Sequence, residues 1–166
     1  MKKIILCAIC AICGFTTANA QKFGHVNANE IMQAMPEVAK VRADLEALSK
    51  QYEADLKMMQ EELQKKYEAY EKEQATLPAN IKQRRETEIT ELQQRFQQSY
   101  QDNQQALAKE EQEKMQPIQK KIMDAIAAVG QEGGYVYIMQ TGAVLYISST
   151  LSTDVTADVK AKLGLK

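Results

Sequence analysis

Hydrophobic residues recur at helical spacing through two long segments of the chain, residues 37–77 and 81–129. The first contains neither Gly nor Pro, and both consist mostly of strong helix formers. A short segment with a proline, residues 76–80, separates them. Because a short turn leaves consecutive helices antiparallel, the pattern predicts a helical hairpin over residues 37–129 with its tip near residues 76–81.

The apolar positions of this hairpin repeat every eleven residues. The step connects Leu45, Leu56 and Tyr67 in the first segment and Phe96, Leu107, Ile118 and Val129 in the second. An eleven-residue repeat corresponds to about 3.67 residues per turn, which favours a nearly straight seam between the helices. At about 1.5 Å per residue, each helix would be roughly 60 Å long. The apolar stripe is narrow, so we expect it to pair two helices without building a third layer.

Two prolines and the tip modify this hairpin. Pro36 suits the first turn of the first helix, where a missing N–H costs nothing. Pro117 lies inside the second segment and predicts an interruption and a kink there. Residues 76–89 are the poorest in apolar side chains, so we expect the tip to be the most mobile part of the hairpin.

After residue 129 the pattern changes to that of short strands. Gly130, Gly133 and Gly134 favour the end of the helix. The apolar runs 135–139 and 143–147 then predict two strands, and the polar residues between them predict a hairpin turn.

Further elements are expected near both ends of the processed chain. Residues 22–26 read as a third short strand, and residues 30–34 as a helical turn. Asp154 follows a polar loop, residues 148–153, and is a candidate N-cap for a short closing helix over residues 155–163.

Both ends of the chain therefore supply strands to one small β body, residues 21–36 and 130–166. A three-stranded sheet with so little helix rarely stands alone, and apolar runs at its edges favour aggregation unless another copy covers them. We therefore expect a homo-oligomer. Its core would hold these apolar residues: Val26, Val136, Ile138, Val144, Leu145, Tyr146 and Ile147.

The first twenty residues have the three parts of a secretory signal peptide. Lys2 and Lys3 supply the positive start, residues 4–15 are an apolar run, and residues 18–20 (ANA) form a small-residue cleavage site. The run is too short to span a bilayer. We therefore expect cleavage after Ala20 and export to an oxidising compartment.

Charge and cysteine content exclude several classes of protein. Without Lys2 and Lys3, 19 basic and 22 acidic side chains remain, a net charge of −3. Such a chain lacks the clustered surplus of Lys and Arg that nucleic-acid binding needs. All three cysteines lie within residues 1–20, so the processed chain would form no disulfide.

Candidate catalytic chemistry is sparse. His25 is the only histidine and lies in a predicted strand, and the sequence has no nucleophile motif and no phosphate-binding glycine loop. Glutamate pairs such as Glu61 and Glu62 lie four residues before lysines, which is typical of a solvated helix face. We therefore expect no enzymatic activity, no metal and no cofactor.

Aromatic and Met side chains near the seam are the candidate binding residues for unfolded clients. They are Tyr52, Met58, Met59, Tyr67, Tyr70, Phe96 and Tyr100. One interpretation is that they only join the two helices. The other is that those at the margins of the seam give an adaptable, weakly selective surface for unfolded chains.

A basic cluster lies near the tip. It consists of Lys82, Arg84 and Arg85, with Arg95 a little further along the second helix. These side chains either keep the turn solvated or dock it on an anionic lipid or client surface.

The order of elements, together with several short motifs, resembles the Skp/OmpH family of periplasmic chaperones. The most specific motifs lie at the ends of the processed chain. They are Val26 and Asn27, Ile31, Pro36 and Glu37, residues 143–146 (AVLY) and residues 154–159 (DVTADV). The combination of signal peptide, strand, long hairpin, two strands and final helix covers essentially the whole processed chain.

This resemblance implies a mainly α fold with a small β body (α+β). A long antiparallel helical hairpin, or tentacle, would project from a β-rich trimerisation domain, as in a jellyfish. It implies a homotrimeric, ATP-independent holdase that encloses unfolded outer-membrane proteins and prevents their aggregation. The best-known members are strongly basic, whereas this chain is not. Binding to lipopolysaccharide or a membrane surface, which is proposed for the family, would therefore have less attraction from basic charge here. The alternative is a structural or adaptor coiled coil of the envelope with one folded partner.

Overall fold

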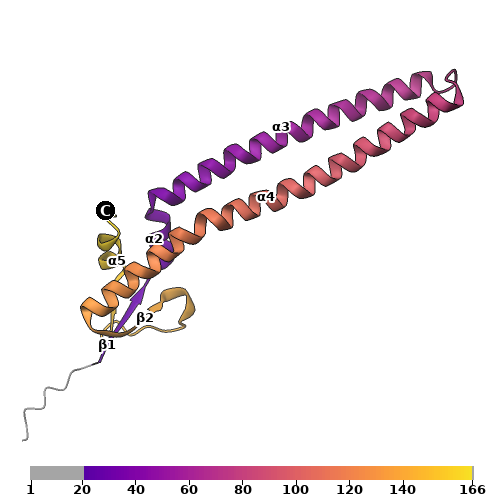
Figure 1. The fold of residues 1–166 in the computed structure, drawn as a ribbon. Coiled ribbons are helices and arrows are strands. Elements are labelled where there is room, and N and C mark those ends of the chain that lie inside the picture. The colour runs from indigo at the N-terminus through magenta and orange to yellow at the C-terminus, as the bar shows by residue number, and fades with distance from the viewer. Residues whose placement is uncertain (1–20, 166) are drawn as a thin grey trace, which may run out of the picture. The chain divides into compact units, whose positions relative to one another are not determined.

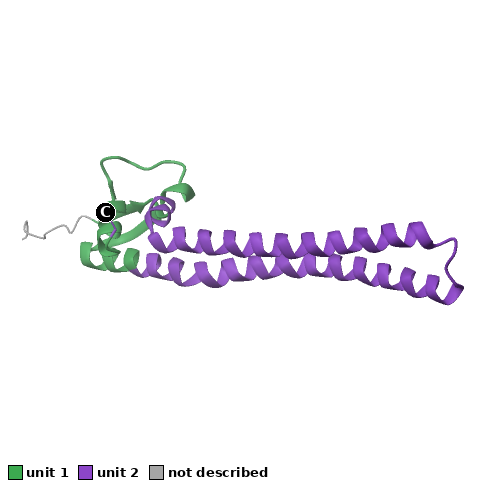
Figure 2. Cartoon of the chain, turned by 90° about the horizontal axis from the view of Figure 1, so that it is seen from above, with its two compact units in different colours: residues 1–28, 125–164, 166 green, residues 29–124, 165 purple. Residues whose placement is uncertain are grey.

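The computed structural model describes residues 21–165, so the expected signal peptide and its cleavage site lie outside the described residues. Figure 1 shows the order of the elements. They are β1 (Lys22–Val26), α2 (Ala28–Ala34), α3 (Pro36–Glu73), α4 (Ala79–Gly133), β2 (Tyr135–Gln140), the 3-10 turn η1 (Thr141–Ala143), β3 (Ser152–Asp154) and α5 (Thr156–Lys162). The described residues divide into two compact units, 21–28 with 125–164, and 29–124 with 165 (Figure 2).

The predicted helical hairpin is confirmed. Helices α3 and α4 lie side by side and antiparallel in both views (Figures 1 and 2). Helix α3 begins at Pro36, directly after Met35 in an extended conformation, so the proline occupies the first helical position. Helix α3 ends at Glu73 and α4 begins at Ala79, which leaves a short connection between them.

The predicted interruption at Pro117 is wrong, because α4 continues through this residue, whereas the kink expected there stays a prediction. A proline inside a helix removes one backbone hydrogen bond and crowds the preceding turn. Ile118 and Ile122, which follow it, are both buried. Their burial offsets the cost of the lost hydrogen bond and keeps the segment helical.

Buried side chains of the hairpin gather in two groups. The first, far from the turn, contains Val38 and Val41 of α3 with Ile118 and Ile122 of α4, and the second, nearer the turn, contains Ile89 and Leu92. Elsewhere in the hairpin, residues 42–88 and 93–117 contribute no fully buried side chain. The two helices are therefore joined through a seam that is only half-buried over most of its length.

Ion pairs between the helices flank this seam. Near the ends of the helices that are remote from the turn, Lys121 lies 2.6 Å from Glu37, and Lys114 lies 3.1 Å from Asp44. The hydrogen bond from Lys121 lowers the pKa of Glu37. Asp44, together with Glu110, raises the pKa of Lys114. Such exposed pairs contribute little stability each, but they favour one register of α3 on α4.

The small sheet has the strand order β2-β1-β3, and both neighbours of β1 run parallel to it. The predicted strand over residues 143–147 and its hairpin turn are therefore wrong. Strand β2 pairs with β1 instead of folding back, so the chain must cross to the other edge of β1 to add a parallel third strand. Parallel strands need such a crossover, and residues 141–151 form it.

Side chains of β2 pack closely on Gly24 of β1. A Cβ atom at this position would lie 3.0 Å from the side chain of Ile138 and 3.2 Å from that of Tyr135, both in β2. The rings of Phe23 and Tyr137 stack with centroids 4.8 Å apart. Gly134, with φ +66°, ends α4 and allows the chain to turn into β2.

Helix α5 is the last element of the unit formed by residues 21–28 and 125–164, which we call the sheet unit. Val155 and Val159 are fully buried, and the amide of Val155 donates to the carbonyl of His25. The amide of Thr156 donates to Oδ1 of Asp154 at 2.9 Å. Asp154 was predicted to be the N-cap of this helix, but Val155 occupies the N-cap position. Asp154 lies one residue before the N-cap and still accepts a hydrogen bond from the first turn. Hydrogen bonding by Thr156 is the main cause that lowers the pKa of Asp154.

Candidate functional site

The hairpin has two chemically different edges. Residues seven or eleven apart share a face of a helix, so Ser49, Leu56 and Tyr67 lie along one margin of α3. By the same spacing, Tyr100 and Leu107 lie along one margin of α4. A hollow of about 390 Å³ joins the two margins on the same side of the seam. Its lining is Leu45, Glu46, Ser49, Gln104, Leu107, Ala108 and Glu111. We call this side the leucine edge.

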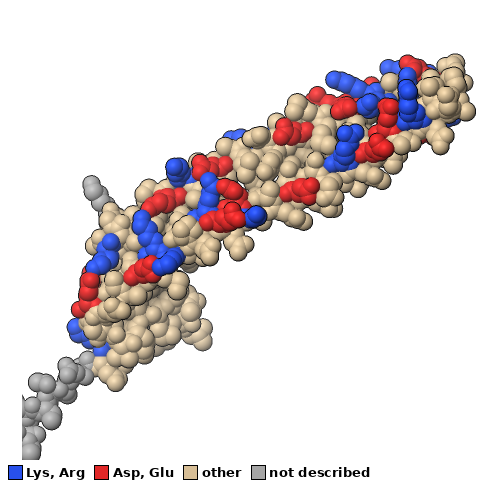
Figure 3. Space-filling model, in the orientation of Figure 1, with Lys and Arg blue, Asp and Glu red and all other residues tan. Residues whose placement is uncertain are grey.

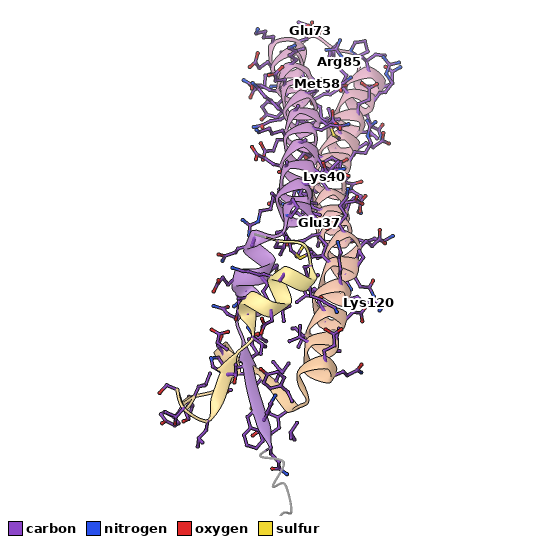
Figure 4. All side chains as sticks on the ribbon, turned by 90° about the vertical axis from the view of Figure 1, so that its left-hand side faces the viewer. Glu37, Lys40, Met58, Glu73, Arg85 and Lys120 are labelled. Carbon is purple, nitrogen blue, oxygen red and sulfur yellow. The ribbon has the colours of Figure 1, made fainter. Side chains whose placement is uncertain are left out.

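The other side of the seam carries ion pairs, and we call it the ion-pair edge. Lys66 lies 3.6 Å from Glu88, and Arg85 lies 2.8 Å from Glu73. Figure 4 labels Glu73 and Arg85, one on each helix near the turn. Together with the pairs Glu37–Lys121 and Asp44–Lys114, these contacts match cation to anion along the hairpin. Figure 3 shows acidic and basic side chains next to one another along it.

The seven client-binding candidates do not form one patch. Tyr67 and Tyr100 are 49% and 52% exposed, and both lie on the leucine edge. Met58 is 62% exposed but lies about 100° around α3 from Met59, away from the seam. The remaining candidates are half-buried in the seam: Tyr52, Met59, Tyr70 and Phe96.

Tyr70 has a polar partner as well as a place in the seam. Its hydroxyl donates a hydrogen bond to the carboxylate of Glu86 on the opposite helix. This bond raises the pKa of Tyr70 to about 12. The sequence offered no signal for this pair, because its members lie in different helices.

The basic cluster near the tip is largely engaged within the hairpin. Arg85 pairs with Glu73, and Nε of Arg84 lies 3.6 Å from Glu88, which also meets Lys66. Lys82 is half-buried and Arg95 is exposed. A hollow of about 360 Å³ at this place contains three cations but also a glutamate. The four residues therefore do not present a compact, unpaired anion site.

The sheet unit exposes a second apolar surface. Leu145 is fully exposed, and Tyr146 and Leu151 are 80% and 75% exposed. Beside them, a hollow of about 180 Å³ is lined mainly by apolar groups, including Phe23, Tyr137 and Ile147. Tyr137, Met139 and Leu151 are also exposed on this unit, although they were not among the predicted oligomerisation residues.

The predicted oligomerisation residues have three different environments. Val26 is buried within the single chain, so it belongs to the fold of one copy. Ile138, Val144 and Ile147 are half-buried. The exposed members of the set are Val136, Leu145 and Tyr146.

Groups with catalytic potential are few in the described part of the chain. Nδ1 of His25 lies 2.8 Å from Oγ of Ser152, and its Nε2 lies 4.0 Å from Asp154. Among residues 21–165 no group of three or more His, Cys, Asp or Glu side chains is placed to hold a metal ion. No helix within the same residues is long and apolar enough to cross a membrane.

The structure thus defines a class of protein: a long helical hairpin joined in sequence to a small parallel sheet, with apolar surface exposed on both units. Residues 22–163 match the family described as outer membrane protein (OmpH-like). The chain belongs to this family, which confirms the resemblance found in the sequence.

Individual relatives agree with this assignment. The chain is 29% identical over 149 residues to a protein named Chaperone protein Skp from Yersinia enterocolitica, covering 90% of each chain. It is 32% identical over 162 residues to the Chaperone protein Skp of Yersinia pestis, covering 96% of this chain and 97% of that one. A crystal structure from Caulobacter crescentus CB15, described as OmpH-like, has a TM-score of 0.74 at 17% identity and covers 86% of this chain and 83% of that one. The mainly α fold with a small β body is confirmed.

Proposed function

We propose that this protein is an ATP-independent periplasmic chaperone that binds unfolded outer-membrane proteins and prevents their aggregation between the two membranes. The observation that carries the proposal is the half-buried seam of the hairpin. Over residues 42–88 and 93–117 no side chain is fully buried, while Tyr67 and Tyr100 remain exposed beside it. The membership of the OmpH-like family and the names of the Skp relatives support the same function.

Weak contacts of this kind suit an unfolded client. Apolar and aromatic side chains offer contact area without a shaped pocket, so many different sequences can bind through them. Each contact is weak, but several hairpins joined in one assembly act on the same client and raise its overall affinity. Release then needs no nucleotide, because each contact opens and closes on its own.

The proposal includes a homotrimer formed through the sheet unit. Leu145 and Tyr146 extend from the crossover into solvent in the single chain. The apolar hollow beside Phe23 and Tyr137 offers a place for such side chains from another copy. Exposed apolar groups of this size on a small sheet are typical of a surface that a partner covers.

The experiment that tests the function is a light-scattering assay. An outer-membrane β-barrel unfolded in urea is diluted into buffer with or without the purified protein, in the absence of nucleotide. We expect scattering to fall to the baseline at one trimer per client, and the same for a second, unrelated barrel. An equal mass of a folded helical protein serves as the control.

Two outcomes would contradict the proposal. Scattering that is unchanged at an excess of trimer overturns the chaperone function. Protection of a single client, with binding to the folded form of that client, favours an adaptor with one partner instead.

A further inference from the structure

The two edges of the hairpin differ in how their charges are matched. On the ion-pair edge each of four contacts joins a cation of one helix to an anion of the other. On the leucine edge the acidic side chains include Glu46, Glu53 and Glu111. Glu46 pairs with Lys50, whereas neither Glu53 nor Glu111 has a cation partner in the described structure.

The hairpin as a whole carries an excess of negative charge. Residues 29–124 contain 19 acidic and 15 basic side chains, a net charge of −4. The inter-helix pairs cancel on the ion-pair edge, so the excess lies elsewhere on the hairpin, and Glu53 and Glu111 place part of it on the leucine edge. Carboxylates beside half-buried Leu and exposed Tyr side chains give the leucine edge a negative potential on a partly apolar surface.

We infer that the leucine edge is the client-contacting face of the hairpin, and that it takes unfolded segments in which Lys or Arg alternate with apolar residues. This inference rests on the proposed chaperone function and names the kind of client segment that its surface fits. Apolar side chains of the segment contact Leu56, Tyr67 and Tyr100, while its cations meet Glu53 and Glu111. The tyrosine rings add an attraction for cations that acidic segments lack.

The ion-pair edge does not fit such a segment. Its charged groups already have partners within the hairpin, and a client cation would have to displace a lysine or arginine to reach them. A client bound there would therefore exchange one ion pair for another with little gain. The unmatched carboxylates of the leucine edge offer the client a new partner without that loss.

The test uses the full processed protein and two labelled unfolded peptides of equal length and equal apolar content. One peptide alternates its apolar residues with Lys, and the other with Glu. Fluorescence anisotropy measures binding at low and at high salt. We expect the Lys peptide to bind at least tenfold more tightly at low salt, with the difference shrinking at high salt because screening weakens exposed charges.

Two variants locate the site. Glu53→Gln with Glu111→Gln should reduce the preference for the Lys peptide severalfold and leave the Glu peptide unaffected or improved. Tyr67→Ser with Tyr100→Ser should weaken both peptides. Both pairs are on the surface, and circular dichroism at matched concentration checks that each variant keeps its helix content.

Matched controls carry the same chemical changes away from the leucine edge. Glu62→Gln with Glu91→Gln removes the same charge from other exposed positions of α3 and α4, and Met58→Ser removes an exposed apolar group from the outer face. The glutamine control should leave the preference for the Lys peptide unchanged, and Met58→Ser should leave the affinity for both peptides unchanged.

The outcomes separate this inference from the function on which it rests. If the wild-type protein suppresses barrel aggregation but binds both peptides equally, the charge preference is wrong and the chaperone function stands. If the glutamine control loses the preference as the Glu53/Glu111 variant does, or Met58→Ser weakens both peptides as the tyrosine variant does, the location is wrong. If the wild-type protein neither binds a peptide nor protects a barrel, the proposed function itself fails.

Discussion

Leu145 provides the most direct test of the proposed assembly. Its side chain is fully exposed in the single chain, at 108% of its reference area, so the fold of one copy does not depend on it. In a trimer built through the sheet unit we expect it to be buried against a neighbouring copy. Leu145→Ser should therefore weaken association while leaving the helix content and the fold of the chain unchanged.

The magnitude of the effect follows from the solvent-exposed area of the leucine that the trimer would bury. Fully burying a Leu side chain is worth about 1.5–3 kcal/mol. A trimer buries three copies, so the association free energy should change by about 5–9 kcal/mol, or about 10³ to 10⁶ in the association constant. Because a trimer association constant has units of inverse concentration squared, the midpoint concentration varies as its inverse square root and should rise by about 30-fold to 1,000-fold.

Sedimentation velocity over a wide range of protein concentrations measures this midpoint. The matched control is Met123→Ser, which changes a similarly exposed apolar side chain of α4. We expect the control to dissociate as the wild type does. A trimer of Leu145→Ser that dissociates at the wild-type concentration would show that this side chain stays in water and would refute the reasoning.

Three further predictions concern single interactions. Gly134→Ala should destabilise the protein by about 1–2 kcal/mol, because the backbone there has φ +66° and nothing within 4 Å would meet the new methyl group. Glu86→Gln should lower the pKa of Tyr70 from about 12 toward its usual value of 10.0, as measured by ultraviolet titration. Asp154→Asn should lower the melting temperature near neutral pH but not in strong acid. The folded pKa of Asp154 lies below 3.8, so its contribution is present above that pH and is lost as the pH falls through the folded value.

Each of these predictions has its own check. Gly142→Ala is the control for the first, since that glycine also has open space around it but no positive φ, and it should cost little. An unchanged Tyr70 titration in the glutamine variant would mean that Glu86 is not its partner in solution. Equal melting curves for wild type and Asp154→Asn across the whole pH range would contradict the role of this carboxylate at the start of α5.

Local sequence patterns predicted the helical part of the protein well. The eleven-residue repeat and the absence of Gly and Pro between residues 37 and 77 specify a long helix, and the short segment around Pro78 specifies the turn. These features act within a few residues of one another, so they do not depend on tertiary contacts. Pro117 is the exception, because the burial of its neighbours outweighed its local effect.

Strand pairing could not be determined in this way. The run 143–147 has the composition of a strand, but β1, more than a hundred residues away, pairs with β2 in parallel and displaces the predicted hairpin. A three-residue strand at Ser152–Asp154 has too little local pattern to be recognised. Pairing between segments so distant in sequence is decided by packing, here by the close approach of β2 side chains to Gly24.

The sequence by itself determined that residues 21–166 are acidic, contain a helical hairpin with apolar segments at its ends and carry little catalytic chemistry, since composition and period are enough for those conclusions. Only the tertiary structure decided which side chains stay exposed. It placed Val26 in the interior and left Leu145 in solvent, and it divided the charges of the hairpin between a matched and an unmatched edge. The reason is physical: exposure and ion pairing depend on which residues of distant segments meet, and no local pattern records that.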